Sequence, residues 1–432
     1  MNRLPKFLAA ALILLFSAQK IISQSLGITA WDAYGMEESY NDSKSYIGIT
    51  GNFLFGSSCV TTAFANNYIG HYFIDSTMSQ QVSSRFSSTN RLGFDLDAGI
   101  TYVHKKDTVF GIPMSGYFFA LRDRNHADAV FPGDLFNLVF QGNAMYAGRF
   151  ANLSNLNASI LHYQQFEFGL SKVYPIYKAN YTVGLALSFL KGQNDLTITT
   201  GNTKLGTQAT GDTLTIDLSA SIKQSDTTNS GYSAFNGWGL STDFFVQFYD
   251  STSEITVRLE VKDLGFIQWN SHALSNNLDT SFIFSGIQVN NLLSPPSMWT
   301  NMLPDSSYIN SYNAHQVKKS FTTFLPASIN LSYRMFLDED HKLPLDAGVN
   351  YRLAANYTPY VYGGVSYFAT KKIILGGSVT YGGYRKLGVG FNFGGNLGKG
   401  YLIALQTQNI ESLIFPNNST GEAALLSFKK FF

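Results

Sequence analysis

The sequence LDAGVNYRL at residues 345–353 alternates between apolar side chains and side chains that are polar or small. The same alternation returns in IILGGSVTYG at residues 373–382 and in LGVGFNFG at residues 387–394. Because side chains two apart lie on one face of a strand, each segment has one apolar face and one polar face. The links at residues 369–372 and 383–386 are short, as between antiparallel neighbours. The last third of the chain therefore predicts a meander of a membrane β-barrel.

The composition of the whole chain favours the same architecture. Charged residues make up 14% of its 432 residues, against about a quarter in soluble domains, and aromatic residues make up 15%. Lipid-facing apolar residues, small lumen-facing residues and aromatic girdles produce such a composition. A large soluble β-sandwich is the rival interpretation, whereas no repeat of roughly 20–50 residues indicates a propeller or solenoid. The formal net charge of +1 gives no reason to expect a nucleic-acid partner.

The amino terminus predicts export. Arg3 and Lys6 precede the apolar run FLAAALILLF at residues 7–16, and small residues follow it, so residues 1–24 are expected to be a signal peptide. Cys59 is the only cysteine, which excludes an intrachain disulfide. No later stretch approaches the roughly 18 apolar residues of a spanning helix, so a membrane protein of this sequence must cross with strands. Those strands must close into a barrel, because lipid satisfies no backbone hydrogen bond.

The alternating segments predict an all-β, transmembrane antiparallel β-barrel of about 14 strands, within a range of roughly 12–18. The barrel is expected over residues 91–432, with long loops near 191–211 and 270–320. Residues 25–90 form either an N-terminal plug or the first strands, and residues 46–65 are left open between wall and plug. An even strand number places both termini in the periplasm, with the barrel in the bacterial outer membrane.

The chain carries no recognisable catalytic or metal-binding motif. Its seven histidines show no spacing typical of metal ligands, and neither a nucleophile elbow, a Walker loop nor a CxxC pair occurs. We therefore predict no enzyme, no cofactor and no metal. Charged residues on presumed inner faces are instead candidates for the lumen, either paired across the pore or forming a selective constriction. These are Asp95, Asp97, Arg122, Arg258, Glu260, Arg334 and Arg352.

Five segments resemble an uncharacterised outer-membrane barrel family of Bacteroidota, classed as a domain of unknown function. They are DLFNLVFQGN at 134–143, FEFGLSK at 166–172, LSFLKG at 187–192, GWGLSTD at 237–243 and VKDLGFIQW at 261–269. More loosely, the chain is similar to long-chain fatty-acid-transporter-like barrels, which include a shuttle component of the type IX secretion system. This resemblance implies a 14-stranded barrel, in some members with an N-terminal hatch, and brings no catalytic residues.

Two local features are interpreted beside the resemblance. The piece from Asp263 to Gly265 is expected to end a strand and shape a turn, with Gly265 relaxing the backbone. Phe428 and Phe432 near the carboxyl terminus resemble the signal that the barrel-assembly machinery reads, although Lys430 stands where an apolar residue is expected.

The sequence thus predicts an outer-membrane barrel that passes or binds a small hydrophobic ligand. The alternative is a barrel with a filled lumen that acts as a binding or assembly component of a secretion or cell-surface complex. A hydrolytic barrel is a third hypothesis, for which no nucleophile is evident. The expected partners are outer-membrane lipid, the barrel-assembly machinery, and either the hydrophobic ligand or a secretion-system protein.

Overall fold

We describe a computed structural model of the chain, covering residues 43–113, 115–284 and 317–432. The predicted signal peptide at 1–24 lies outside the described residues. So do residues 25–42 of the predicted N-terminal segment and residues 285–316 of the predicted long loop.

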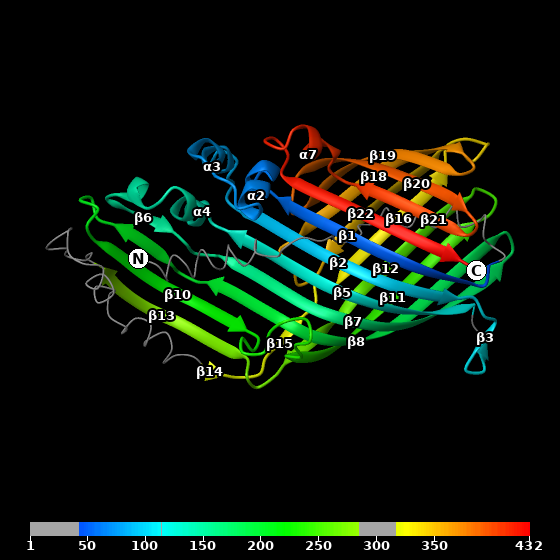
Figure 1. The fold of residues 1–432 in the computed structure, drawn as a ribbon, viewed down its shortest axis with the longest axis horizontal. Coiled ribbons are helices and arrows are strands. Elements are labelled where there is room, and N and C mark those ends of the chain that lie inside the picture. The colour runs from blue at the N-terminus through cyan, green and yellow to red at the C-terminus, as the bar shows by residue number, and fades with distance from the viewer. Residues whose placement is uncertain (1–42, 114, 285–316) are drawn as a thin grey trace.

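The main sheet closes on itself as an antiparallel barrel of 14 strands, as the sequence predicts (Figure 1). Each wall strand pairs with the next around the ring, and β1 pairs with both β2 and β22, which completes the closure. In ring order the strands are β1 (Ser45–Ser57), β2 (Asn90–His104), β5 (Gly116–Phe131), β7 (Asn157–Ile176), β8 (Ala179–Thr200), β11 (Gly237–Asp250), β12 (Ile255–Trp269), β16 (Ser328–Phe336), β17 (Pro344–Arg352), β18 (Thr358–Thr370), β19 (Ile373–Gly383), β20 (Leu387–Gly398), β21 (Tyr401–Thr407) and β22 (Gly421–Phe431).

The period-two pattern of the sequence sets the two faces of this wall. In β20, Leu387 and Phe391 project outward and are exposed, while the intervening Gly388 and Asn392 are buried in the lumen. Outward-facing apolar side chains suit lipid, and small or polar residues fit the crowded interior. This alternation therefore forms the apolar outer surface that a membrane-spanning barrel needs.

The two ends of the barrel differ. At the end where β1 begins and β22 finishes, most connections are short, such as residues 177–178, 371–372 and 399–400. A longer one at this end holds the small hairpin of β3 (Thr108–Val109) and β4 (Ile112–Pro113). The opposite end carries the longer connections and all the described helices: α2 (Thr62–Ile69), α3 (Ser76–Ser83), α4 (Gly133–Phe140), η3 (Ala144–Tyr146) and α7 (Ile410–Ile414) (Figure 1).

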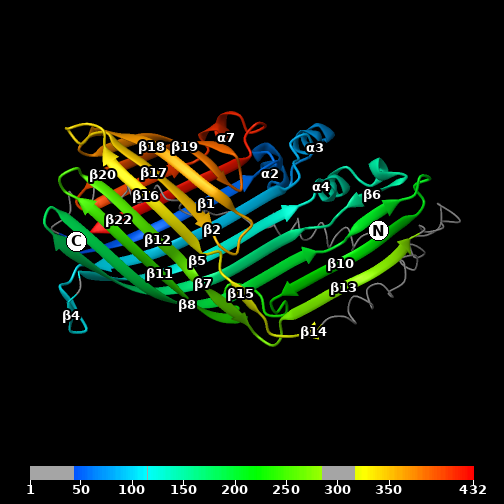
Figure 2. The same cartoon turned by 180° about the vertical axis from the view of Figure 1, so that it is seen from behind.

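Part of the wall continues beyond the ring as a second, open stretch of sheet. β8 pairs with β11 up to Gly192 and then, from Leu196 onward, with β10 (Leu214–Gln224). Figure 2 shows this extension projecting from the helix-bearing end. It replaces the loop predicted near residues 191–211, and it also occupies part of the loop predicted at 270–320. Its other strands are β6 (Arg149–Asn152), β9 (Lys204–Thr207), β13 (Leu274–Phe284) and β14 (Val317–Lys318).

The segment that the sequence left open between wall and plug contributes to both the wall and the rim. Ser45–Ser57 is β1, and α2 follows with Thr61 as its N-cap, whose side chain accepts a hydrogen bond from the Phe64 amide. The three helices α2, α3 and α4 pack through Phe64, Val82 and Phe136 against the rim ends of β1 and β2. No helix among the described residues is long and apolar enough to cross a membrane.

Candidate functional site in the barrel lumen

The seven charged lumen candidates all lie on the inward face of the wall, where they alternate with exposed apolar side chains such as Ile100, Leu121 and Leu259. β2 carries two of them, β12 carries two, and β5, β16 and β17 carry one each. In that order they are Asp95 and Asp97, Arg258 and Glu260, and then Arg122, Arg334 and Arg352.

The lumen is crossed by an ion pair between opposite sides of the barrel. Arg352 Nη1 of β17 donates to Asp95 Oδ2 of β2 across 2.7 Å. These strands lie seven places apart around the ring of 14 in either direction. The exposed fractions of the two side chains are only 2% and 0%. Two buried charges therefore meet in the middle of the barrel.

A second bridge crosses the lumen between β5 and β12. Arg124 Nη2 donates to Asp263 Oδ2 at 2.8 Å, and Gln165 Nε2 donates to Asp263 Oδ1 at 3.1 Å. Arg124 Nε also lies 3.4 Å from Asp97 Oδ2. One guanidinium thus faces carboxylates from two strands.

The turn predicted at Asp263 is wrong, and the reason is a β-bulge. Asp263 sits inside β12, at a register shift opposite Thr242 and Phe244, and has a positive φ of 59°. Its amide donates to Asp243 Oδ1 at 2.7 Å. A bulge re-aims the side chain at its position, and here it directs the Asp263 carboxylate into the lumen. From the neighbouring sequence alone, a residue at a β-bulge cannot be distinguished from a turn residue.

The first bridge continues toward the helix-bearing end as a chain of polar contacts. His126 Nδ1 lies 2.7 Å from Asp95 Oδ1, and His126 Nε2 lies 3.4 Å from Asp128 Oδ2. The Tyr384 hydroxyl also contacts Asp128 Oδ2, at 3.4 Å. Arg352 stacks over the Tyr357 ring at 4.9 Å. We call this buried group the lumen seal: Asp95, His126, Asp128, Arg352, Tyr357 and Tyr384.

The seal depends on a glycine. Tyr384 comes from the connection between β19 and β20 and lies flat against Gly93 on the inner face of β2. A Cβ at Gly93 would overlap the Tyr384 ring. Tyr357, from the connection between β17 and β18, packs edge-on against Tyr384 with ring centroids 4.9 Å apart. Two loop tyrosines therefore fold into the mouth of the barrel over the ion pair.

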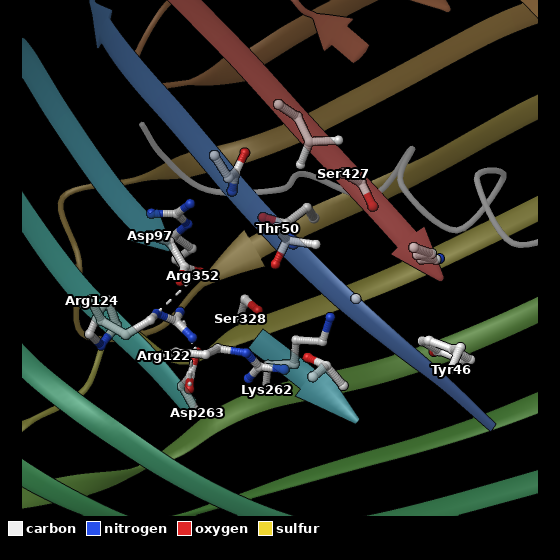
Figure 3. Close-up of a pocket in the computed structure, with 17 residues that line it drawn as sticks. Tyr46, Thr50, Asp97, Arg122, Arg124, Lys262, Asp263, Ser328, Arg352 and Ser427 are labelled. Carbon is white, nitrogen blue, oxygen red and sulfur yellow. Dashed lines mark hydrogen bonds and ion pairs between the residues drawn. The ribbon is translucent and has the colours of Figure 1, made fainter. Parts of the chain in front are cut away.

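A polar cavity of about 240 Å³ lies on the other side of the two bridges (Figure 3). Its wall includes residues from the start of β1 and the end of β22, so it occupies the lumen toward the short-turn end. Strands from opposite sides of the barrel contribute its charged lining. Those side chains are Asp97, Arg122, Arg124, Lys262, Asp263, Arg352 and Lys429.

The remaining lumen candidates form pairs that do not cross the pore. Arg258 Nη2 donates to Glu260 Oε1 on its own strand at 2.6 Å. Arg334 Nε donates to Asp346 Oδ1 on the adjacent strand β17, also at 2.6 Å. Arg122 Nη1 lies 2.7 Å from Glu167 Oε2 of the neighbouring β7. Each of these pairs thus stays on one strand or joins two neighbouring strands, and none of them bridges the lumen.

The two aromatic residues of the predicted assembly signal lie at the short-turn end. Phe428 faces outward from β22, and Phe432 follows the strand with an exposed ring. The Phe432 amide donates to the Ser45 carbonyl at 3.0 Å. In the described part of the chain, no group of three or more His, Cys, Asp or Glu side chains is placed to hold a metal ion.

Sequence reasoning missed His126, Asp128 and the two loop tyrosines. The sequence did contain a signal for His126 and Asp128. They follow Arg122 and Arg124 at intervals of two residues along β5, so they lie on the same inward face. β5 continues past both residues to Phe131, so they belong to the same strand as the two arginines. No local pattern indicates that a loop tyrosine folds back into a lumen.

The fold is similar to several solved outer-membrane barrels. A mutant of the monoaromatic hydrocarbon channel TodX has a TM-score of 0.47 at 10% identity, with 96% of each chain covered. The Ralstonia pickettii toluene transporter TbuX gives 0.43 at 9%, covering 96% of this chain and 97% of that one. A Pseudomonas aeruginosa FadL homologue gives 0.42 at 8%, covering 96% and 99%. No curated protein matches the sequence. A family model matches residues 40–404, and the chain therefore belongs to the family of unknown function DUF5723.

Proposed function

We propose that this protein is a gated channel of the bacterial outer membrane, which passes a small solute when its lumen seal opens. The observation that carries this proposal is the buried ion pair between Asp95 and Arg352 across the full width of the barrel. Packing a lumen permanently with apolar side chains costs less than burying two charges, because each charge must be desolvated. An ion pair, in contrast, can exchange its partners for water or solute. A gate fits this arrangement better than a permanent filling.

We infer that the short-turn end of the barrel, where β1 begins and β22 finishes, faces the periplasm. Outer-membrane barrels have short periplasmic turns and longer extracellular connections. The helices α2, α3, α4 and α7 and the sheet extension would then lie outside the cell. The assembly machinery would meet Phe428 and Phe432 from the periplasmic side.

The small hydrophobic ligand expected from the sequence stays a prediction. Supporting it, Tyr72 and Phe73 between α2 and α3 expose aromatic rings at the helix-bearing end. The bridged part of the lumen below is polar, so a hydrophobic molecule would bind at this rim before it reached the charged bridges. The alternative role, a filled barrel in a secretion or cell-surface complex, becomes the working hypothesis if the channel never opens.

The test is single-channel conductance of the purified mature protein in a planar bilayer. The double variant Asp95→Asn/Arg352→Gln removes both charges of this ion pair. Asn keeps the size of Asp, whereas Gln is shorter than Arg but stays polar. Because single removal would leave one buried charge unpaired, at a cost of about 3–5 kcal/mol, the double change protects the fold. We expect openings that are more frequent or longer than those of the unmodified protein.

The matched control is Lys204→Gln/Asp217→Asn, which removes an ion pair of 3.2 Å from the extension outside the barrel. This variant should conduct like the unmodified protein. Heat-modifiable gel migration establishes that every variant is a folded barrel. If the folded seal variant stays as silent as the control, the gate hypothesis is wrong and the lumen is filled permanently.

A further inference from the structure

The polar cavity below the bridges presents cations to its interior. Its lining contains five cationic side chains against two carboxylates. Both carboxylates, Asp97 and Asp263, already face Arg124. Figure 3 shows Arg122, Lys262 and Arg352 around the same space. The charge balance at the cavity surface is therefore positive.

Three of the other four cations pair with carboxylates that lie outside the lining. Glu167 pairs with Arg122 at 2.7 Å, Glu260 pairs with Lys262 at 3.1 Å, and Asp95 pairs with Arg352. None of these three carboxylates lines the cavity. A solute in the cavity meets the guanidinium and ammonium groups first, and a low-dielectric wall strengthens their field.

Three uncharged side chains provide an independent sign of a ligand site. Asn52 Nδ2, Asn350 Oδ1 and Ser427 Oγ are buried and have no hydrogen-bond partner among the described residues. Their residues are 5%, 4% and 1% exposed, and all three line the cavity. Because buried polar atoms are nearly always paired, these atoms are available to a bound molecule. They come from β1, β17 and β22, and they offer an amide donor, an amide acceptor and a hydroxyl.

We propose that this cavity binds a small hydrophilic molecule that carries an oxyanion, either a carboxylate or a phosphate. The cationic side chains would bind the oxyanion, and Asn350 Oδ1 would accept a hydrogen bond from a hydroxyl group of the same molecule. A cavity of about 240 Å³ suits a solute of a few carbon atoms. Most of the lining side chains are polar or charged, with Tyr46, Pro326 and Leu425 among the exceptions, so the cavity suits a hydrophilic solute better than a hydrocarbon.

The same site is coupled to the bridges. Arg124 and Arg352 line the cavity and also hold Asp263 and Asp95 across the lumen. An oxyanion that binds these guanidiniums competes with the two carboxylates and so weakens the bridges. This coupling rests on the proposed gate, and it makes the bound solute the agent that opens it.

The first test is calorimetric titration of the folded barrel in detergent with four probes: inorganic phosphate, succinate, glycerol and choline. We expect binding of phosphate, of succinate or of both, with no binding of neutral glycerol or cationic choline. Which anion binds identifies the source of the oxyanion. Binding should weaken as salt is added, because salt screens the cations. Equal binding of choline, or no binding of either anion, would overturn the proposal.

Variants locate the site. Lys262→Met and Ser427→Ala should each weaken anion binding, Lys262→Met by about tenfold or more. Lys204→Met on the extension removes the same charge far from the lumen and should leave binding unchanged. An equal affinity in all three folded proteins would place the anion elsewhere and refute the site. The conductance experiment is separate, so a silent channel that binds phosphate contradicts the gate alone.

Discussion

At the residue scale, Gly93 allows the lumen to close. Its missing side chain lets the Tyr384 ring lie against β2, next to the Asp95 pair. A methyl group there would force the ring away, because aromatic rings are rigid and the barrel wall cannot retreat. The closure of the pore therefore depends on a residue that has no side chain of its own.

We predict that Gly93→Ala gives a folded barrel with a leaking lumen. The change displaces Tyr384, and with it the contact to Tyr357, and water then reaches the ion pair. Bilayer recordings should show added background conductance. Gly363→Ala is the control, since the atom nearest to an added Cβ there is 3.9 Å away. If Gly93→Ala shows no added background conductance, Tyr384 does not close the pore.

Cys59 gives a second prediction at this scale. It follows β1 in the core under α2, has no exposed surface, and burial raises the pKa of its thiol to about 11. The thiolate is the reactive form, so roughly one thiol in a thousand is reactive at pH 8. Maleimide should leave the folded protein unlabelled and should label it quickly after heating in detergent. Rapid labelling at pH 8 without heat would mean that this core opens.

At the element scale, a short strap ties the extension to the barrel. β15 (Thr322–Phe324) pairs with the end of β12. The Trp269 Nε1 group donates to Thr323 Oγ1 at 2.9 Å, and the Thr323 hydroxyl donates to Asp195 Oδ1 at 2.9 Å. One hydroxyl thus connects β12 with the part of β8 that continues past the ring.

Thr323→Val should loosen this strap. Valine keeps the shape of threonine but leaves the indole nitrogen and the Asp195 oxygen without this partner, at a cost of about 1–3 kcal/mol. Hydrogen exchange of residues 319–327 should accelerate, since local opening becomes easier. Thr322→Val removes a hydroxyl that bonds Gln268 on the exposed surface, and it should change exchange little. Equal exchange in both variants would contradict the role of Thr323.

The strands themselves were the most predictable elements. The alternation in β17, β19 and β20 is local, and it specified both the wall and its two faces. The strand β10 of the extension alternates in the same way at residues 214–222, but a local alternation does not show whether a strand belongs to the ring or continues beyond it. The bulge at Asp263 was missed for a related reason, since a residue with positive φ indicates a turn unless its partners across the sheet are known.

At the scale of the whole molecule, the local pattern does not show which charges meet. It placed Asp95 and Arg352 on inner faces, but their pairing follows from a ring in which β2 and β17 are opposite. That geometry depends on the strand count and on every register between them. The sequence thus named Asp95 and Arg352 as lumen candidates, but it showed neither the pairing between them nor the other four residues of the lumen seal.

The difference between the two ends gives a prediction about orientation. In a Cys59→Ser background, Thr77→Cys places a thiol on exposed α3 and Asp340→Cys places one on an exposed short-turn connection. A bulky, membrane-impermeant maleimide should label the first in intact cells. It should label the second only after the outer membrane is permeabilised. The reverse labelling pattern would mean that the barrel has the opposite orientation in the membrane.

The bridge across the lumen also orders the biogenesis of the barrel. Asp95 and Arg352 are 257 residues apart in the chain. The Asp95 carboxylate therefore has no arginine partner until the strands between them have been inserted. During that interval the ring still lacks β17 to β22, so the lumen has neither its complete wall nor its ion pair. A mutation that stalls insertion before β17 would therefore do more than lower the yield of protein. It would leave unfinished pores in the envelope, and the cell would become sensitive to toxic compounds that the mature barrel keeps out.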